Sequence, residues 1–221
     1  MIRVNPFDWT ADFRIARALA EAYKASGFDD VLFFCVGDPA DPIGRLGVLV
    51  ADETIKYYKN VMGTSDAPIT RETLARSAAE ALEKWPGRFI IAVEAGSGLP
   101  AHLGSVEITD RGLMSAPPDI AGALGLPDVT VNVVLRVDEG AARRREAAAA
   151  GGGRETGRNV EGLRQAELEI GTDGDGAALG RRNRFKPLRP EQITDSVVRK
   201  LADTVIDGNL RLLSKIGKQK I

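Results

Sequence analysis

The sequence predicts an α/β protein in which a mostly parallel sheet is covered by helices on both faces. Apolar runs of strand length alternate with stretches whose apolar residues recur every three or four positions. The run at residues 89–93 is apolar throughout, as expected for a central strand that is buried on both faces. Strands that are separated by helices need crossover connections, which are typical of parallel sheets.

Local signals place each element. The first helix begins near Thr10 or Asp8, either of which can cap it, and ends at Gly27. Further helices are expected at 43–58, from 68–72 to Trp85 with the apolar stripe Leu74, Ala78, Ala81 and Leu82, and at 194–215. Strands are expected at 31–36, 60–63, 89–93, 104–109 and 129–137, the fourth of them as an edge or antiparallel strand.

The chain has 221 residues, which is long for one domain and short for two. Residues 140–186 are rich in alanine, glycine and arginine and contain too few large apolar residues to build a core. We therefore expect one domain formed by residues 1–139 and 187–221, with 140–186 as an insertion.

Composition and charge argue against several classes of function. A formal net charge of −1 gives no support for a nucleic-acid partner. No apolar run approaches the ~20 residues of a membrane span, and residues 1–6 lack the features of a signal peptide. The single cysteine, Cys35, excludes an internal disulfide. We expect a cytoplasmic protein without a membrane partner.

The loop that follows the first strand is rich in glycine and acidic. It carries the carboxylates Asp38 and Asp41 and no lysine, which favours acid–base or metal chemistry over phosphate binding. In open α/β sheets, ligands bind beyond the carboxyl ends of the strands. The binding positions assigned to this loop are Gly37, Gly44 and Gly47. The alternative is structural, with Asp41 capping the next helix and Asp38 in a turn.

A second candidate group follows the central strand. Glu94 is expected to end this strand, so its carboxylate would face those of the first loop if the two strands are neighbours. Such carboxylates can share a proton, bind a divalent cation or hold a water. Ser97 and His102 follow, and His102 is the only histidine. One histidine and one cysteine cannot form a closed zinc site, and Ser97 lacks the nucleophile-elbow sequence.

The order of these segments resembles the YyaC family, sporulation proteins described as spore proteases. The matching pieces are residues 35–47, 62–69, 89–98, 104–108 and 195–213. The family is similar in fold to hydrogenase-maturation endopeptidases and to the germination protease. The resemblance thus implies a three-layer phosphorylase/hydrolase-like fold with acidic residues at strand ends.

The resemblance implies a sporulation-related, peptidase-like hydrolase that acts on a protein or peptide. Its catalytic carboxylates would be Asp38 or Asp41 together with Glu94, positioning a water or a divalent metal ion. Gly44 stands where the family has an acidic residue, and Glu94 where it usually has aspartate. A non-catalytic module that binds a protein segment or a small ligand is the alternative. A nucleoside- or phosphate-binding enzyme is disfavoured, because Arg45 is the only basic residue beside the loop.

Overall fold

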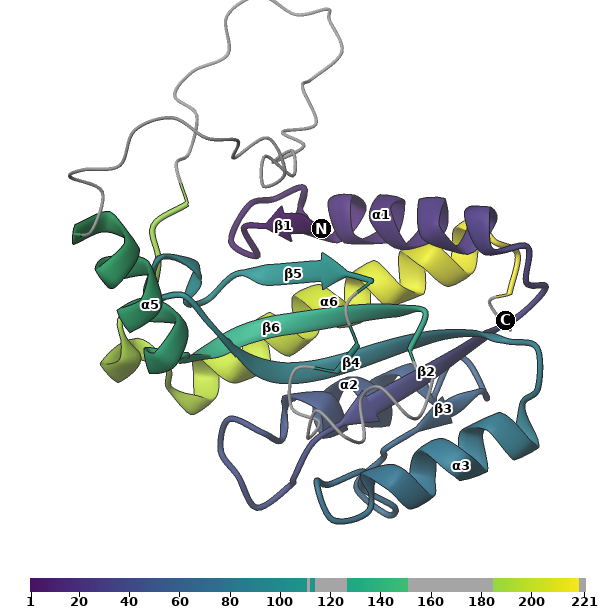
Figure 1. Ribbon diagram of the computed structural model, residues 1–221. Helices are drawn as coiled ribbons and strands as arrows, with labels where there is room; N and C mark the ends of the chain where they lie inside the picture. Colours follow the sequence, from purple (N-terminus) through teal and green to yellow (C-terminus); the bar gives the residue numbers. More distant parts are fainter. Residues whose placement is uncertain (111, 114–126, 151–184, 219–221) are drawn as a thin grey trace, which may run out of the picture.

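The computed structural model describes residues 1–110, 112–113, 127–150 and 185–218. Six strands form one sheet in the order β1-β5-β6-β4-β2-β3 (Figure 1). Neighbouring strands among β6, β4, β2 and β3 are parallel, whereas β5 is antiparallel to both β6 and β1. The strands are β1 (Ile2–Val4), β2 (Val31–Val36), β3 (Val61–Met62), β4 (Phe89–Gly98), β5 (Val106–Thr109) and β6 (Val129–Val137). The prediction of an α/β protein with a mostly parallel sheet is confirmed.

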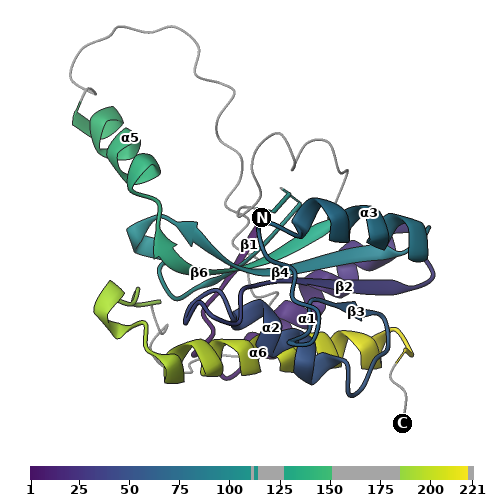
Figure 2. The same ribbon diagram turned by 90° about the horizontal axis from the view of Figure 1, so that it is seen from below.

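Helices lie on both sides of this sheet. Figure 2 shows α3 on one face and α1, α2 and α6 on the other, with α5 extending away from the sheet. The larger apolar core packs between the sheet and the second group of helices, and a smaller core packs under α3. The helices are α1 (Ala11–Ser26), α2 (Leu46–Thr54), α3 (Leu74–Lys84), α5 (Glu139–Ala150) and α6 (Asp195–Lys215), with short 3-10 turns η1 (Pro100–His102) and η2 (Pro190–Gln192).

Several element boundaries differ from the prediction. Strand β1 was not expected, because three residues are too few to show an alternating pattern. It pairs with the outer side of β5, so β5 is antiparallel as predicted but is not an edge strand. Helix α2 is shorter than predicted, because the chain after Thr54 turns to bring Tyr58 back to the sheet. Leu82 is 47% exposed and does not belong to the buried stripe of α3.

Strand β4 continues four residues beyond Glu94, so the prediction that Glu94 ends this strand is wrong. The sequence Gly96-Ser97-Gly98 is typical of a turn, but here it pairs with the long strand β6. Glycine is needed at position 96 because the Asn132 side chain occupies the space beside it. A Cβ atom at Gly96 would lie 2.2 Å from Asn132 Oδ1.

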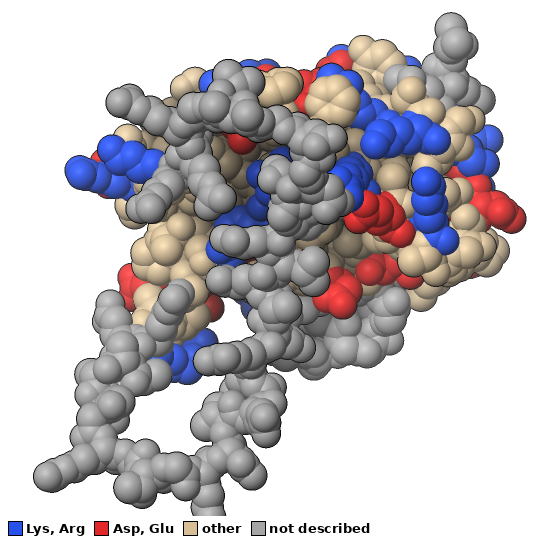
Figure 3. Space-filling model, turned by 90° about the horizontal axis from the view of Figure 1, so that it is seen from above, with Lys and Arg blue, Asp and Glu red and all other residues tan. Residues whose placement is uncertain are grey.

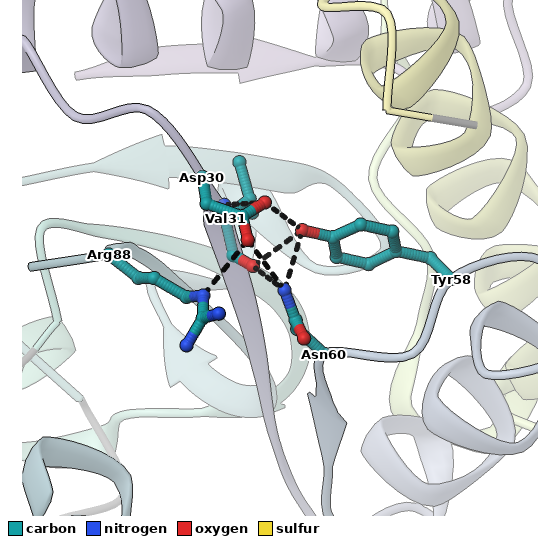
Figure 4. Close-up of polar contacts among 5 residues, drawn as sticks. All are labelled: Asp30, Val31, Tyr58, Asn60 and Arg88. Carbon is teal, nitrogen blue, oxygen red and sulfur yellow. Dashed lines mark hydrogen bonds and ion pairs between the residues drawn. The ribbon is translucent and has the colours of Figure 1, made fainter. Parts of the chain in front are cut away.

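A polar network fixes the start of β2 (Figure 4). The carboxylate of Asp30 accepts hydrogen bonds from the Tyr58 hydroxyl at 2.5 Å, from Asn60 Nδ2 at 3.0 Å and from Arg88 Nε at 3.0 Å. Tyr58 and Asn60 are 5% and 3% exposed. Burial, followed by the hydrogen bond to Asp30, raises the pKa of Tyr58 well above its usual value. This network joins β2, the segment before β3 and the chain entering β4.

The structure describes residues 140–150 and 185–186 of the predicted insertion at 140–186. Residues 140–150 form most of α5, which projects from the sheet (Figure 2). Residues 151–184 of the insertion lie outside the described residues. Within the described ranges, no helix is long and apolar enough to cross a membrane. Lys, Arg, Asp and Glu side chains are interspersed over the described surface in Figure 3.

Candidate functional site

Four polar side chains form one row across the sheet, which we call the polar row. Arg3 of β1 lies opposite Glu107 of β5, and Glu107 lies opposite Asn132 of β6. Asn132 in turn lies opposite Glu94 of β4. Directly opposed residues on paired strands project from the same face of the sheet. The alternation along β4 puts Glu94 on the same face as Ile90 and Ala92, whose side chains belong to the core under α3.

The centre of the polar row is buried. Glu94 and Asn132 are each only 1% exposed, and the Asn132 Oδ1 atom has no hydrogen-bond partner in the described structure. A charged or amide group inside a sheet is costly unless other groups compensate for its lost hydration. Two such residues side by side in the buried centre of the sheet therefore indicate a functional role more strongly than a packing role.

His102, the only histidine of the chain, contacts Glu107 in the outer part of the polar row. His102 Nδ1 lies 3.0 Å from Glu107 Oε1, and the same oxygen accepts a hydrogen bond from Arg3 Nε at 2.9 Å. The side chains of His102 and Glu107 are 16% and 12% exposed. His102 ends the short turn η1, which directly follows β4. The fold thus brings this histidine, which sequence spacing left in a loop, to the face that carries Glu94.

The acidic loop after β2 is held at the carboxyl edge of the sheet. Asp41 forms an ion pair with Arg136 near the end of β6, and its Oδ1 accepts the backbone N–H of Ile43 at 3.0 Å. Burial, the largest influence, raises the pKa of Asp41, but the N–H groups of Ile43 and Gly44 and the charge of Arg136 outweigh it. The pKa of Asp41 therefore lies below its usual value. Asp41 stays ionised near neutral pH.

Asp38 has a simpler environment. It is exposed, and its Oδ1 accepts the backbone N–H of Ala40 at 2.9 Å, as in a turn. Asp41 likewise makes a local turn and does not cap α2, whose first residue is Leu46. The Ala40 contact agrees with the structural alternative for Asp38, a turn residue, whereas the predicted cap of α2 by Asp41 is wrong. The ion pair with Arg136 gives Asp41 a role beyond its own loop.

The predicted site residues fall into two groups. Asp41 reaches across the end of β4, because β4 lies between β2 and β6 and Arg136 is opposite Ser97. Glu94 and His102 are linked through the polar row. That Asp38, Asp41 and Glu94 line one crevice stays a prediction.

The glycines assigned to binding lie against the protein itself. A Cβ atom at Gly47 would lie 2.1 Å from the Val36 carbonyl oxygen, and one at Gly37 would lie 2.4 Å from the Gly44 oxygen. At Gly44 the nearest atom is a carboxylate oxygen of Asp41, at 2.8 Å. Close packing of the loop and of α2 against β2 thus accounts for these glycines without a ligand.

The donor set does not suit a metal ion. The described residues contain no group of three or more His, Cys, Asp or Glu side chains that could hold one. The carboxylates of Asp41 and Glu107 are each paired with an arginine. No step at this site is therefore assigned to the divalent metal ion that the sequence left open.

Sequence reasoning missed Arg3, Glu107, Asn132 and Arg136. One signal was present, since Asn132 interrupts the apolar run at 131–135 and a polar residue in a buried strand needs an explanation. Glu107 fits the polar phase of an alternating strand, so it resembles a solvent-facing residue. Arg3 and Arg136 carry no local signal, because their roles depend on strand pairing.

A separate groove of about 360 Å³ lies between α2 and α6. These helices are on the face of the sheet opposite α3 (Figure 2), so the groove is not part of the polar row. It is lined by Leu49, Asp52, Glu53, Tyr57, Arg199, Ala202, Asp203, Ile206, Asp207 and Leu210. None of the predicted site residues lines it.

Comparisons with known proteins do not identify a family for this chain. No family model and no curated protein sequence matches the chain. The resemblance to the YyaC family therefore stands as an expectation from the segments 35–47, 62–69 and 89–98, and function has to be argued from the polar row and the acidic loop.

Proposed function

We propose that the chain is a peptidase-like hydrolase that cleaves a protein or peptide substrate, with Glu94 as the carboxylate that activates water. The observation that carries this proposal is the burial of Glu94, 1% exposed, beside Asn132 in the polar row. A buried carboxylate next to other polar groups is a common arrangement for acid–base catalysis. The three-layer phosphorylase/hydrolase-like fold and a link to sporulation belong to the same proposal, through the resemblance.

The reaction consumes one water. Glu94 accepts a proton from the water as the water oxygen bonds to the peptide carbonyl carbon. The carbon–nitrogen bond then breaks, and the leaving nitrogen takes a proton from an acid of the site. The products are a carboxylic acid and an amine. Asn132 Oδ1, which has no hydrogen-bond partner in the described structure, would accept a hydrogen bond from a substrate N–H in this reaction.

Asp41 has a supporting role in this proposal. Its pairing with Arg136 and with the Ile43 N–H keeps it charged and fixed, which makes it a poor proton acceptor but a stable anchor for the loop. The loop borders the end of β4, three residues beyond Glu94, where Ser97 lies opposite Arg136. Asp41 and Arg136 would thus shape the substrate entrance, with the exposed Asp38 at its rim.

A non-catalytic binding module is the second candidate, and one observation favours it. The carboxylate expected to work with Glu94 is neutralised, because Asp41 is paired with Arg136. With Asp41 committed to Arg136, the site would bind a peptide through Asn132 and Glu94 without cleaving it. The two candidates differ in whether a bound peptide is turned over.

The Glu94→Gln variant tests the hydrolase. The amide keeps the shape of the side chain but cannot accept a proton from water, so the cleavage rate should fall at least about 100-fold. We would measure the cleavage of fluorescently labelled casein and of a mixed peptide library by the wild type and the variant. Circular dichroism and thermal unfolding would show whether the variant is folded.

The control is Glu53→Gln, which removes a partly exposed carboxylate that pairs with nearby Lys56, on the other face of the sheet. It should leave cleavage unchanged. A Glu94→Gln variant that is folded and fully active would move the chemistry elsewhere, and one that does not fold would make Glu94 structural. Peptides that bind to the wild type and are released intact would favour the binding module.

A further inference from the structure

His102, a second acid–base group, contacts the polar row, and the side chains of Glu107 and Arg3 set its position. Glu107 lies between His102 and Arg3, and both contact its Oε1 atom, at 3.0 Å and 2.9 Å. Arg3 comes from β1, Glu107 from β5 and His102 from η1. The arginine fixes the carboxylate, and the carboxylate in turn fixes the histidine ring.

The backbone around His102 is also fixed. Its N–H donates to the Leu99 carbonyl oxygen at 2.8 Å, and its carbonyl oxygen accepts the Ser105 N–H at 2.9 Å. The next residues are bonded to the sheet, since the Gly104 N–H donates to the Val134 carbonyl oxygen at 2.7 Å. The ring is thus held both through its main chain and through Nδ1.

The contact with Glu107 determines where the histidine carries its proton. An ionised carboxylate only accepts hydrogen bonds, so Nδ1 has to be the protonated nitrogen when the ring is neutral. The lone pair of the neutral ring then lies on Nε2. When the ring is charged, Nε2 carries the proton that can be given away, and Glu107 stabilises the ring in both states.

The position of this pair suits the reaction at Glu94. Glu107 and Glu94 flank Asn132 in the same row, so their backbones are two strand spacings apart, about 10 Å. Both side chains project from one face of the sheet, and His102 reaches that face through its contact with Glu107. Asn132 therefore lies between Glu94 on one side and Glu107, which contacts His102, on the other.

We propose that Glu107 is a positioning residue that holds His102 so that Nε2 gives its proton to the leaving nitrogen of the substrate. This inference rests on the proposed hydrolase function and names the acid for it. The proton moves from His102 Nε2 to the nitrogen as the carbon–nitrogen bond breaks, which leaves the neutral ring with its proton on Nδ1. The proton that Glu94 took from water restores the charged ring through solvent.

A purely structural role for the three residues is the competing explanation. The Arg3–Glu107 ion pair joins β1 to β5, and this alone would stabilise the edge of the sheet. That role needs no particular position of the proton on His102. The tautomer of the ring shows whether Glu107 sets its orientation. A loss of kcat with little change in KM, which the structural role does not predict, separates the two explanations.

Because His102 is the only histidine, the ring nitrogens can be observed without assignment. We would label the full chain with ¹⁵N-histidine and record long-range ¹H–¹⁵N spectra at a pH where the ring is neutral. We expect the proton mainly on Nδ1 in the wild type. In Glu107→Gln the amide can donate to Nδ1, so the proton should move mainly to Nε2. The control Glu21→Gln, which removes an exposed carboxylate paired with Arg17, should leave the spectrum unchanged.

Kinetics complete the test. On a substrate that the wild type cleaves, Glu107→Gln should lower kcat about 100-fold or more and change KM little, and His102→Gln should do the same. A wild-type ring protonated on Nε2, an unchanged ring in Glu107→Gln, or full activity of His102→Gln would overturn the proposal. If the wild type cleaves nothing, the hydrolase function fails, whereas the spectra still decide whether Glu107 positions the ring.

Discussion

Replacing Asp30 by alanine is expected to lower the free energy of unfolding by about 3 kcal/mol. The substitution removes the acceptor shared by Tyr58, Asn60 and Arg88 (Figure 4). Tyr58 and Asn60 are almost fully buried, and after the substitution they keep the Val31 carbonyl oxygen as an acceptor but lose the charged one. Urea unfolding followed by circular dichroism would measure the change.

The neighbouring Asp29 provides a matched control, because it is exposed and lies just before the network. Asp29→Ala should change stability by less than about 0.5 kcal/mol. A double-mutant cycle of Asp30→Ala with Tyr58→Phe should show coupling of about 1 kcal/mol, since both changes remove the same hydrogen bond. Equal effects of Asp30→Ala and Asp29→Ala would mean that the network adds nothing to stability.

The pKa of Asp30 predicts how the free energy of unfolding depends on pH. Burial, the largest influence, raises its pKa, but hydrogen bonds from Tyr58, Arg88 and the Val31 N–H and the charge of Lys218 outweigh it. The pKa of Asp30 in the folded protein is therefore below its ordinary value of 3.8. A lowered carboxyl pKa contributes stability that is complete above the unfolded pKa and is lost as pH falls through the folded pKa. The stability gap between wild type and Asp30→Ala should thus narrow below about pH 4. A gap that is constant from pH 7 to pH 3 would contradict this.

Two strands in the interior of the sheet could be predicted from the sequence with their bounds. β2 and β6 have the predicted bounds. β2 is buried on both faces and is apolar throughout, whereas β6 alternates between apolar and polar residues over much of its length. β1 could not be predicted from the sequence, since it has only three residues and is held by pairing with β5. The extension of β4 past Glu94 also depends on a partner strand, which overrides the turn preference of Gly96-Ser97-Gly98.

The candidate site was predictable in its residue types and less so in its arrangement. Glu94 and His102 stood out because they are acid–base groups near the central strand. Their link through Glu107 depends on the register of β5 against β6, and a shift of one residue would turn Glu107 to the other face. The Asp41–Arg136 pair joins residues 95 positions apart, and no local pattern encodes such a contact.

Gly63→Ala is expected to destabilise the protein by about 4 kcal/mol, through two effects at one position. Gly63 has a φ angle of +92°, in which residues with a Cβ atom are strained. A Cβ atom here would also lie 1.9 Å from the backbone oxygen of Cys35 in β2, so β3 would have to move away from the sheet. Urea unfolding would measure the loss.

Gly27→Ala separates these two effects. Gly27 has a similar φ angle of +73° at the end of α1, but a Cβ atom there would meet nothing within 4 Å. Gly27→Ala should therefore lower the free energy of unfolding only through backbone strain, by about 1 kcal/mol. The excess at Gly63 measures how tightly β3 is packed against β2, next to the place where the Gly37 N–H donates to the Ile69 carbonyl oxygen and the acidic loop begins. Equal costs at the two glycines would show that β3 can shift freely, and the acidic loop would then lack the rigid support that a catalytic role demands.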